Sequence, residues 1–289
     1  VGISFAGNYW ESVSAQDGTK LEREHNIEKP WVGDPFELGE EYDENTPSMQ
    51  RSRLVRNALA WAIERDSMIE NLGGGIGFVN HQPYLSVTNP GYQEQWNWGT
   101  DFDRARDLLA EAGYPDGFDM EVYTPGGGIL GQAFDLMMSA WERELSVKVK
   151  RSRMNYGAYR PGLASRTTDV PGYFICGDEN NGAFPYDWPH GLPATSHTIG
   201  GFGIGQELPY ALNAYNSAAK ELDTKARKTF AQEFFTQNRY WANCVGLFEG
   251  PIWSIYDPDA LEGGDWDQRP NANPNFWTIN NLRSVKLTR

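Results

Sequence analysis

The chain has 289 residues, of which 39% are hydrophobic and 22% are charged, close to the usage of ordinary globular proteins. Its 25 Lys and Arg residues against 39 Asp and Glu residues give a formal net charge of −14. Because this charge repels the phosphates of nucleic acids and anionic lipid headgroups, we expect no nucleic-acid partner and no attraction to a membrane surface. The length fits one large α/β lobe plus segments that belong to another lobe.

The chain carries no segment that is typical of membrane insertion. No stretch approaches the roughly 20 apolar residues that span a bilayer, and the N-terminus lacks the basic-then-apolar pattern of a signal peptide. Residues 1–5 (VGISF) have the pattern of a strand already under way, which favours a truncated chain over a mature start. Cys176 and Cys244 both lie in apolar runs. Two buried thiols are favoured over a disulfide, which would indicate an oxidising compartment.

Hydrophobic periodicity in the first half of the chain alternates between helix and strand. Apolar residues at positions 55, 58, 59, 62, 63 and 69 follow the helical period, and the glycines at 73–75 stop that helix. Gly113 ends a second helix. In chain order, the pattern predicts a helix over 52–69, a helix over about 101–112, a strand over 118–123, a helix over about 130–145 and a strand over 147–150.

The second half continues this alternation but contains one long irregular segment. Residues 177–209 are too many for a plain connector, and their aromatic side chains favour a function. We predict, in order, a polar helix over 156–164, a strand over 173–176, helices over 211–222 and 224–241, a strand over 245–248 and a late strand-like run over 284–287.

Two segments, 54–66 (LVRNALAWAIERD) and 103–118 (DRARDLLAEAGYPDGF), form a specific pair of motifs. Together they closely resemble the signature of the family 5 extracellular solute-binding proteins, the dipeptide, oligopeptide and nickel type. That family pairs a helix of the form VRxALxxAIDR with a later KAxxLLAEAGYPDGF, in the same order and at about the same separation. This chain departs from the pattern at Glu64 and Arg106, neither of which falls at an expected ligand site.

The resemblance implies an α/β fold of the periplasmic binding protein type II kind, with two lobes that close on a hinge. Family members are longer than this chain, so mainly the second lobe would be present, with strands crossing to the first. Residues 1–50 would form the end of the first lobe and a hinge crossing, 51–248 the second lobe, and 249–289 the return crossing and a C-terminal segment of the first lobe.

The resemblance also implies a function. The chain would be the substrate-binding component of an ABC importer, which captures a small solute between its lobes and delivers it to a membrane permease. A peptide or an oligosaccharide is the favoured ligand, and the sequence does not identify it further. The protein would be a monomer in the periplasm or outside the cell, with or without a lipid anchor.

Asp178 is the strongest candidate ligand-binding residue. It follows the predicted strand over 173–176 at its carboxyl end, where open α/β sheets bind ligands. By resemblance, peptide-binding members place an Asp here that pairs with the ligand α-amine in a charge-assisted hydrogen bond. Ile175 and Asn181 stand where those members have Trp and an acidic residue before Pro, which weighs against a peptide, and Asp178 could instead cap a turn. The other candidates, which could also be packing residues, are Tyr9, Trp10, Asn180, Tyr186 and Trp188.

Other arrangements that could carry chemistry are weaker. The glycines at 73–77 follow a helix, opposite to the order of a dinucleotide-binding loop, and His190 and His197 match no common metal-ligand spacing. A glycoside hydrolase, with Asp178 and either Glu179 or Asp187 as its carboxylates, is the alternative function. Because nothing in the spacing singles out such a pair, we expect a binding protein with no catalytic residue, no metal and no cofactor.

Overall fold

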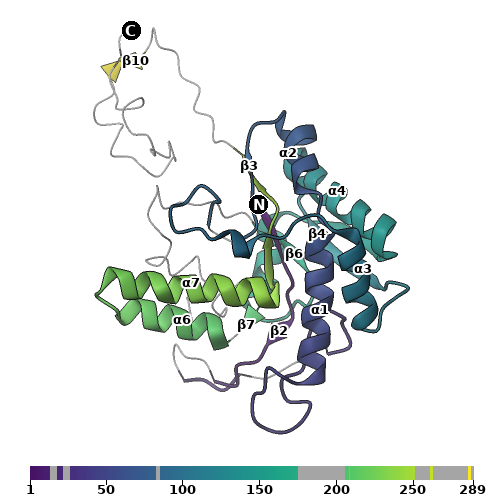
Figure 1. Ribbon diagram of the computed structural model, residues 1–289, viewed down its shortest axis with the longest axis vertical. Coiled ribbons are helices and arrows are strands. Elements are labelled where there is room, and N and C mark those ends of the chain that lie inside the picture. The colour runs from purple at the N-terminus through teal and green to yellow at the C-terminus, as the bar shows by residue number, and fades with distance from the viewer. Residues whose placement is uncertain are drawn as a thin grey trace.

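A five-stranded mixed sheet organises the fold in this computed structural model (Figure 1). The structure describes residues 1–13, 18–21, 27–82, 85–174, 206–207, 209–250, 261–262 and 286–287. Strands β5, β4 and β6 are parallel, whereas β1 runs antiparallel to both of its neighbours, β6 and β8. In spatial order the strands are β5 (Lys148–Arg153), β4 (Asp119–Thr124), β6 (Gly172–Phe174), β1 (Gly2–Ser4) and β8 (Cys244–Gly246).

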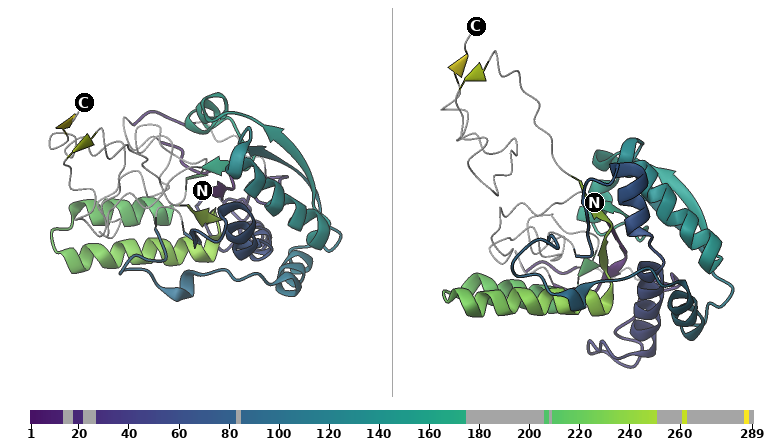
Figure 2. Two further views of the ribbon diagram at one scale, coloured as in Figure 1. Left: turned by 90° about the horizontal axis from the view of Figure 1, so that it is seen from above. Right: turned by 45° about the horizontal axis from the view of Figure 1, so that its top comes forward.

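The helices gather in two places. Figure 1 shows α1 to α4 together on the right, and α6 and α7 side by side at the lower left, an arrangement that Figure 2 repeats from two other directions. The helices are α1 (Pro47–Trp61), α2 (Arg65–Gly73), the 3-10 helix η1 (Glu94–Trp96), α3 (Phe102–Glu111), α4 (Gly128–Leu145), α5 (Tyr156–Ala164), α6 (Pro209–Lys220) and α7 (Thr224–Trp241). Short strands pair as β2 (Asn8–Tyr9) with β7 (Gln206–Glu207), β3 (Phe78–Val79) with β9 (Phe248–Glu249), and β10 (Leu261–Glu262) with β11 (Lys286–Leu287).

Side-chain caps explain where several helices begin. Thr46 precedes Pro47 and accepts a hydrogen bond from the Met49 amide, so α1 starts five residues before the predicted helix. Asp101 accepts from the Arg104 amide at the start of α3, close to the predicted start of that helix. Asp223 likewise caps α7. Each cap satisfies amides that the first helical turn leaves without a partner.

The predicted continuous helix over 52–69 is wrong, because the structure divides it into α1 and α2. Segments distant in sequence take the carbonyl groups that a continuing helix would use. The Asp101 amide donates to the Trp61 carbonyl (3.0 Å), and the Thr100 hydroxyl donates to the Ile63 carbonyl (2.8 Å). The periodic pattern persists across the break since both helices bury one face, and periodicity alone does not reveal a change of direction.

Most of the other predicted elements are confirmed within the described residues. The strand at 1–5 is β1, the strand over 118–123 is β4, and the helix over 130–145 is α4. The predicted strand over 245–248 is two short strands, since β8 pairs with β1 whereas β9 pairs with β3. The irregular segment 177–209 lies mostly outside the described residues, as does Cys176, whereas Cys244 is buried in β8.

The main hydrophobic core lies between the sheet and helices α1 to α4. Ile3 of β1, Val122 of β4 and Phe134 of α4 are fully buried there. Leu59 of α1 joins them, and its carbonyl accepts a hydrogen bond from the Trp141 indole (2.8 Å). Since β1 contributes to this core and to the same sheet as β4, the first residues of the chain pack in one unit with residues more than a hundred positions away. The division of the chain at residues 50 and 248 stays a prediction.

Two arginines are buried in the interior and donate to carbonyl groups. Arg56 donates to the carbonyls of Trp31 (2.6 Å) and Trp241 (2.9 Å), so it joins three segments. Arg65 donates to the carbonyls of Asn80 (3.1 Å) and Gly246 (3.0 Å) and so holds the end of β8. Burial lowers the pKa of both guanidinium groups to about 9, and they stay charged at neutral pH.

His81 makes the stability of the fold sensitive to acid. The Trp98 amide donates to its Nδ1 (3.2 Å), and burial, together with nearby Arg65 and Arg239, lowers the pKa of His81 to about 3. The folded state therefore keeps a neutral imidazole, while the unfolded chain binds a proton below its ordinary pKa of 6.5. The contribution of His81 to the stability of the folded state is therefore present above pH 6.5 and is lost as the pH falls toward 3.

We predict that His81→Asn, which keeps an acceptor for the Trp98 amide, makes unfolding less dependent on acid. Between pH 7 and pH 4 the wild-type protein should lose on the order of 3 kcal/mol more than the variant, since each unit of pKa depression costs about 1.4 kcal/mol. The measurement is the free energy of urea unfolding at both pH values. Equal losses for the two proteins would show that His81 does not carry this acid sensitivity.

Candidate functional site

The sheet has two different ends along the direction of its strands, and only one of them collects the carboxyl ends of strands. Strands β4, β5, β6 and β8 point the same way and end at Thr124, Arg153, Phe174 and Gly246. Open α/β sheets bind ligands outside such carboxyl ends. We call this end of the sheet the carboxyl edge, and we call the opposite end, where β6 and β8 begin, the amino edge. Neither term refers to the outer strands β5 and β8.

Val1 lies at the carboxyl edge, next to the chain that returns from β8. Its terminal nitrogen donates to the Phe248 carbonyl (3.0 Å), and its carbonyl accepts from the Leu247 amide (2.9 Å). Asn80 and Glu249 contribute a side-chain hydrogen bond beside this pair of segments. The first residue of the chain and the residues just after β8 are therefore neighbours.

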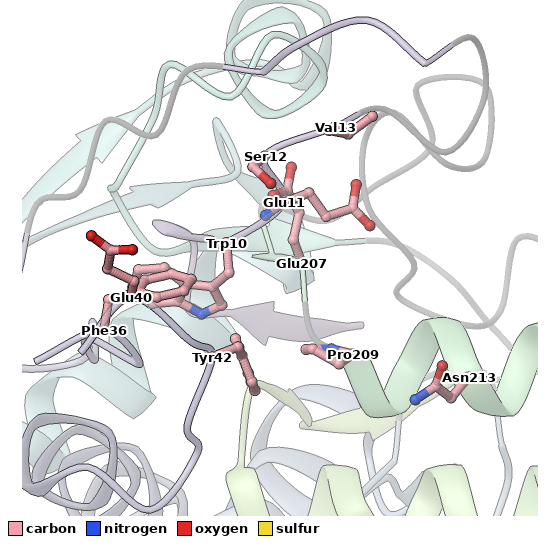
Figure 3. A pocket seen from close by; sticks show the side chains of 10 residues that line it. All are labelled: Trp10, Glu11, Ser12, Val13, Phe36, Glu40, Tyr42, Glu207, Pro209 and Asn213. Atoms are coloured by element: carbon pink, nitrogen blue, oxygen red, sulfur yellow. Dashed lines mark hydrogen bonds between the residues drawn. The ribbon is translucent and has the colours of Figure 1, made fainter. Parts of the chain in front are cut away.

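A cavity of about 460 Å³ lies at the amino edge, beyond the carboxyl end of β1 (Figure 3). Its walls come from the chain after β2, from the loop before α1, from β7 and from the start of α6. Figure 3 shows the aromatic side chains on the left and the residues of α6 on the right. The lining residues are Trp10, Glu11, Ser12, Val13, Phe36, Glu40, Tyr42, Glu207, Pro209 and Asn213.

A buried ion pair supports the floor of this cavity. Arg166 contacts both carboxylate oxygens of Glu207, at 2.6 Å from Nε and 2.9 Å from Nη2, and the two side chains are 7% and 0% exposed. The Glu11 amide donates to the same carboxylate (2.8 Å), and the Glu11 carbonyl accepts from Arg166 (3.0 Å). Three segments distant in sequence are thereby fixed to one another.

Burial sets the protonation chemistry of this ion pair. It raises the pKa of Glu207 to about 7, against the opposing effects of the Glu11 amide and the Arg166 guanidinium. The ring of Tyr9 lies 5.7 Å from the same guanidinium, and burial with the nearby Glu207 carboxylate raises the pKa of its phenol. The phenol of Tyr9 therefore stays uncharged beside the ion pair.

Two of the residues that the sequence had grouped as ligand-binding candidates, Tyr9 and Trp10, lie in the described part of the chain. Tyr9 and Trp10 are 3% and 4% exposed and follow β1 at the amino edge, where Trp10 lines the cavity and Tyr9 packs on Arg166. Strand β6 ends instead at the carboxyl edge. The candidates that follow it in sequence, which lie outside the described residues, are Asp178, Asn180, Tyr186 and Trp188.

Sequence reasoning missed several residues that build the cavity. Arg166 and Glu207 are 41 positions apart, and no spacing rule joins two charges at that separation. Glu207 also fell in the predicted irregular segment. Phe36 and Tyr42 stand in a loop whose aromatic residues had no partner assigned, and their rings meet edge to face at 6.1 Å. Of the residues that line the cavity, only Trp10 was selected from the sequence as a candidate, because it is an aromatic residue in a predicted loop.

The described part of the chain lacks two other kinds of feature. No group of three or more His, Cys, Asp or Glu side chains there is arranged to hold a metal ion. None of the helices there combines the length and the apolarity required to cross a bilayer.

The fold is that of part of a two-lobe periplasmic binding protein. Residues 14–170 match the family described as bacterial extracellular solute-binding proteins, family 5 Middle, and the chain therefore belongs to this family. Both motifs that suggested the family, 54–66 and 103–118, lie within the matched residues. No curated protein matches the sequence.

Solved structures show the same fold at low sequence identity. A dipeptide-binding protein from a Pseudoalteromonas species, in complex with Met-Leu, is 20% identical with a TM-score of 0.59 over 76% of this chain and 43% of its own. The periplasmic binding protein DppA from Helicobacter pylori, in complex with a peptide, is 20% identical with a TM-score of 0.53, and the match covers 69% of this chain and 39% of DppA. NikA from Brucella suis, in complex with Fe(III)-EDTA, is 17% identical with a TM-score of 0.53, and the match covers 74% of this chain and 46% of NikA. The chain spans less than half the length of each.

We predict that Arg166→Met destabilises the protein by about 3–5 kcal/mol, because it leaves a buried carboxylate without its cation. The double variant with Glu207→Leu should recover part of this loss, since no buried charge remains. The Arg166→Met penalty should be smaller at pH 5 than at pH 8, because the Glu207 carboxyl, whose pKa is already about 7, is then protonated.

Urea unfolding of the single and double variants at both pH values measures these effects. The matched control is Arg106→Met, which removes an exposed arginine from a surface ion pair and should change the stability far less than Arg166→Met does. A double variant that is less stable than Arg166→Met at pH 8 would contradict the assignment of the penalty to the buried charge.

Proposed function

We propose that this chain is part of the solute-binding subunit of an ABC importer, and that it contributes one lobe to a ligand site between two lobes. The observation that carries the proposal is the family match over residues 14–170. The direction of the strands supports it, because four of them end at the edge where sheets of this class receive ligands. The protein then binds its solute without converting it and delivers it to a membrane permease.

The ligand-binding residues that we propose follow strand β6 in the sequence. Asp178 and Asn180 come four and six positions after Phe174, which ends that strand at the carboxyl edge. A carboxylate in a closed cleft forms a charge-assisted hydrogen bond with a ligand ammonium group, worth about 1.5–3 kcal/mol. Tyr186 and Trp188 would supply aromatic walls to the same cleft.

The ligand that we propose is a small peptide, with an oligosaccharide as the other candidate. Peptides occupy two of the solved relatives, whereas a third holds a metal chelate. Closure of the lobes over the ligand is the proposed mechanism, since a ligand that contacts both lobes stabilises the closed state by its differential affinity. A protein of this role works as a monomer, outside the cytoplasm, in contact with its permease.

A binding screen tests the proposal. Dipeptides, tripeptides and neutral oligosaccharides are added singly to the purified protein, and its melting temperature is recorded. We expect at least one compound to raise the melting temperature and to be recovered unchanged by mass spectrometry. Consumption of the compound would instead support an enzyme, and a screen without any stabilising compound would contradict the proposed ligand classes.

For a compound with a free amine, we predict that Asp178→Asn raises the dissociation constant by about 10- to 100-fold, since about 1.4 kcal/mol is lost per factor of ten. Isothermal titration calorimetry gives the constant. The matched control is Asp116→Asn, at an exposed turn between α3 and β4, which should leave it unchanged. Equal affinities of the wild-type protein and the Asp178→Asn variant would remove Asp178 from the site.

A further inference from the structure

The cavity at the amino edge lies apart from the edge where ligands of this fold class bind. Residues 5–13 continue from the end of β1 that is paired with Gly172 and Cys244, the first residues of β6 and β8. The carboxyl ends of those strands lie at the other edge of the sheet. A ligand in the cavity would therefore occupy a place of its own, and its binding does not depend on the function proposed above.

The cavity walls are held in place by contacts that need no ligand. The strands β2 and β7 pair at Tyr9 and Glu207, and the ion pair with Arg166 fixes their side chains. In the loop before α1, the Asp43 amide donates to the Pro35 carbonyl (2.9 Å) and closes the turn that carries Phe36 and Tyr42. A preformed site loses little conformational entropy when it binds a ligand.

The charged side chains among the described lining residues of the cavity are all acidic. Its carboxylates are those of Glu11, Glu40 and Glu207, and no Lys or Arg is among the described lining residues. Arg166 offsets the charge of Glu207 from behind. Glu40 is exposed and forms no ion pair with the described residues. An anion would therefore meet a repulsive wall, whereas a cation would be attracted to it.

The aromatic wall adds a second attraction for a cation. The indole of Trp10 and the rings of Phe36 and Tyr42 line one side of the cavity, and Figure 3 shows them together with the Glu40 carboxylate at their outer end. Aromatic faces attract ammonium groups through the electrostatic field of their rings, and several rings around one carboxylate recognise substituted ammonium ions. A volume of about 460 Å³ suits a small molecule.

We propose that the cavity lined by Trp10, Phe36, Tyr42 and Glu40 is a second binding site, which takes a small organic cation with an ammonium group. The aromatic rings would contact the apolar groups around the nitrogen. Glu40, with Glu11 on the far side, would balance its charge. Glu207 contributes to the shape of the site but brings no net charge, because Arg166 compensates it.

The test compares choline with its neutral isostere 3,3-dimethylbutanol, which has the same shape without the charge. Binding is followed by isothermal titration calorimetry and by the change in tryptophan fluorescence. We expect choline to bind at least tenfold more tightly than the isostere, and its affinity to fall as salt is added. Equal affinities for the two compounds, or no binding of choline, would overturn the proposal.

Two matched variants locate the binding. Glu40→Gln, which removes the charge of an exposed residue of the wall, should weaken choline binding about fivefold or more. Glu41→Gln, at the adjacent exposed position outside the wall, should leave it unchanged. Asp178→Asn should also leave choline binding unchanged, which separates this site from the proposed cleft. Choline affinity that is insensitive to Glu40→Gln would overturn the assignment of this cavity.

Discussion

The pairing of strand β1 with two strands from the far half of the chain is the constraint on which the structure depends. Gly2–Ser4 lies between β6 and β8, so residues near position 3 pair with residues near 173 and 245. A side chain at Gly2 would come within 2.6 Å of the Val245 carbonyl, and only a glycine allows the strands to approach this closely. Since buried amide and carbonyl groups must be paired, the loss of β1 would leave two strands with open edges.

Strand β1 also gives the sheet its two different edges. Because β1 alone runs against the others, its start lies with the carboxyl ends of β4, β5, β6 and β8, and its end lies with their amino ends. One edge thus receives the first residue of the chain and the return from β8. The other receives β2, β7 and the acidic aromatic cavity. The cavity therefore lies at the opposite edge from the carboxyl end of β6.

Buried cations reinforce this arrangement through carbonyl groups and one carboxylate. Arg65 joins the end of β8 to the segment that follows β3, and Arg56 joins Trp31 to the end of α7. Arg166 is the one of the three that has a buried acidic partner, Glu207. A guanidinium group has several donors in a fixed plane, so it can satisfy carbonyls from segments that have no other contact. These contacts add order where the chain crosses between elements.

Local pattern determined much of the secondary structure. The alternation around Val122 and the helix stop at Gly113 are both signals carried by a few neighbouring residues, and β4 and α3 lie where these signals placed them. The motifs over 54–66 and 103–118 determined the family as well. The break after Trp61 was not predictable, because its cause is a hydrogen bond from Asp101, forty residues away.

The sequence by itself therefore determined the class of fold, most helices and strands, the family and the acidic character of the chain. It also marked Trp10 as a residue of interest. Only the tertiary structure decided that Trp10 shares a cavity with Tyr42 and Glu207, and that this cavity lies at the opposite edge from the end of β6. The physical reason is that helices, strands and caps depend on neighbours in sequence, whereas a cavity depends on which distant segments the sheet brings together.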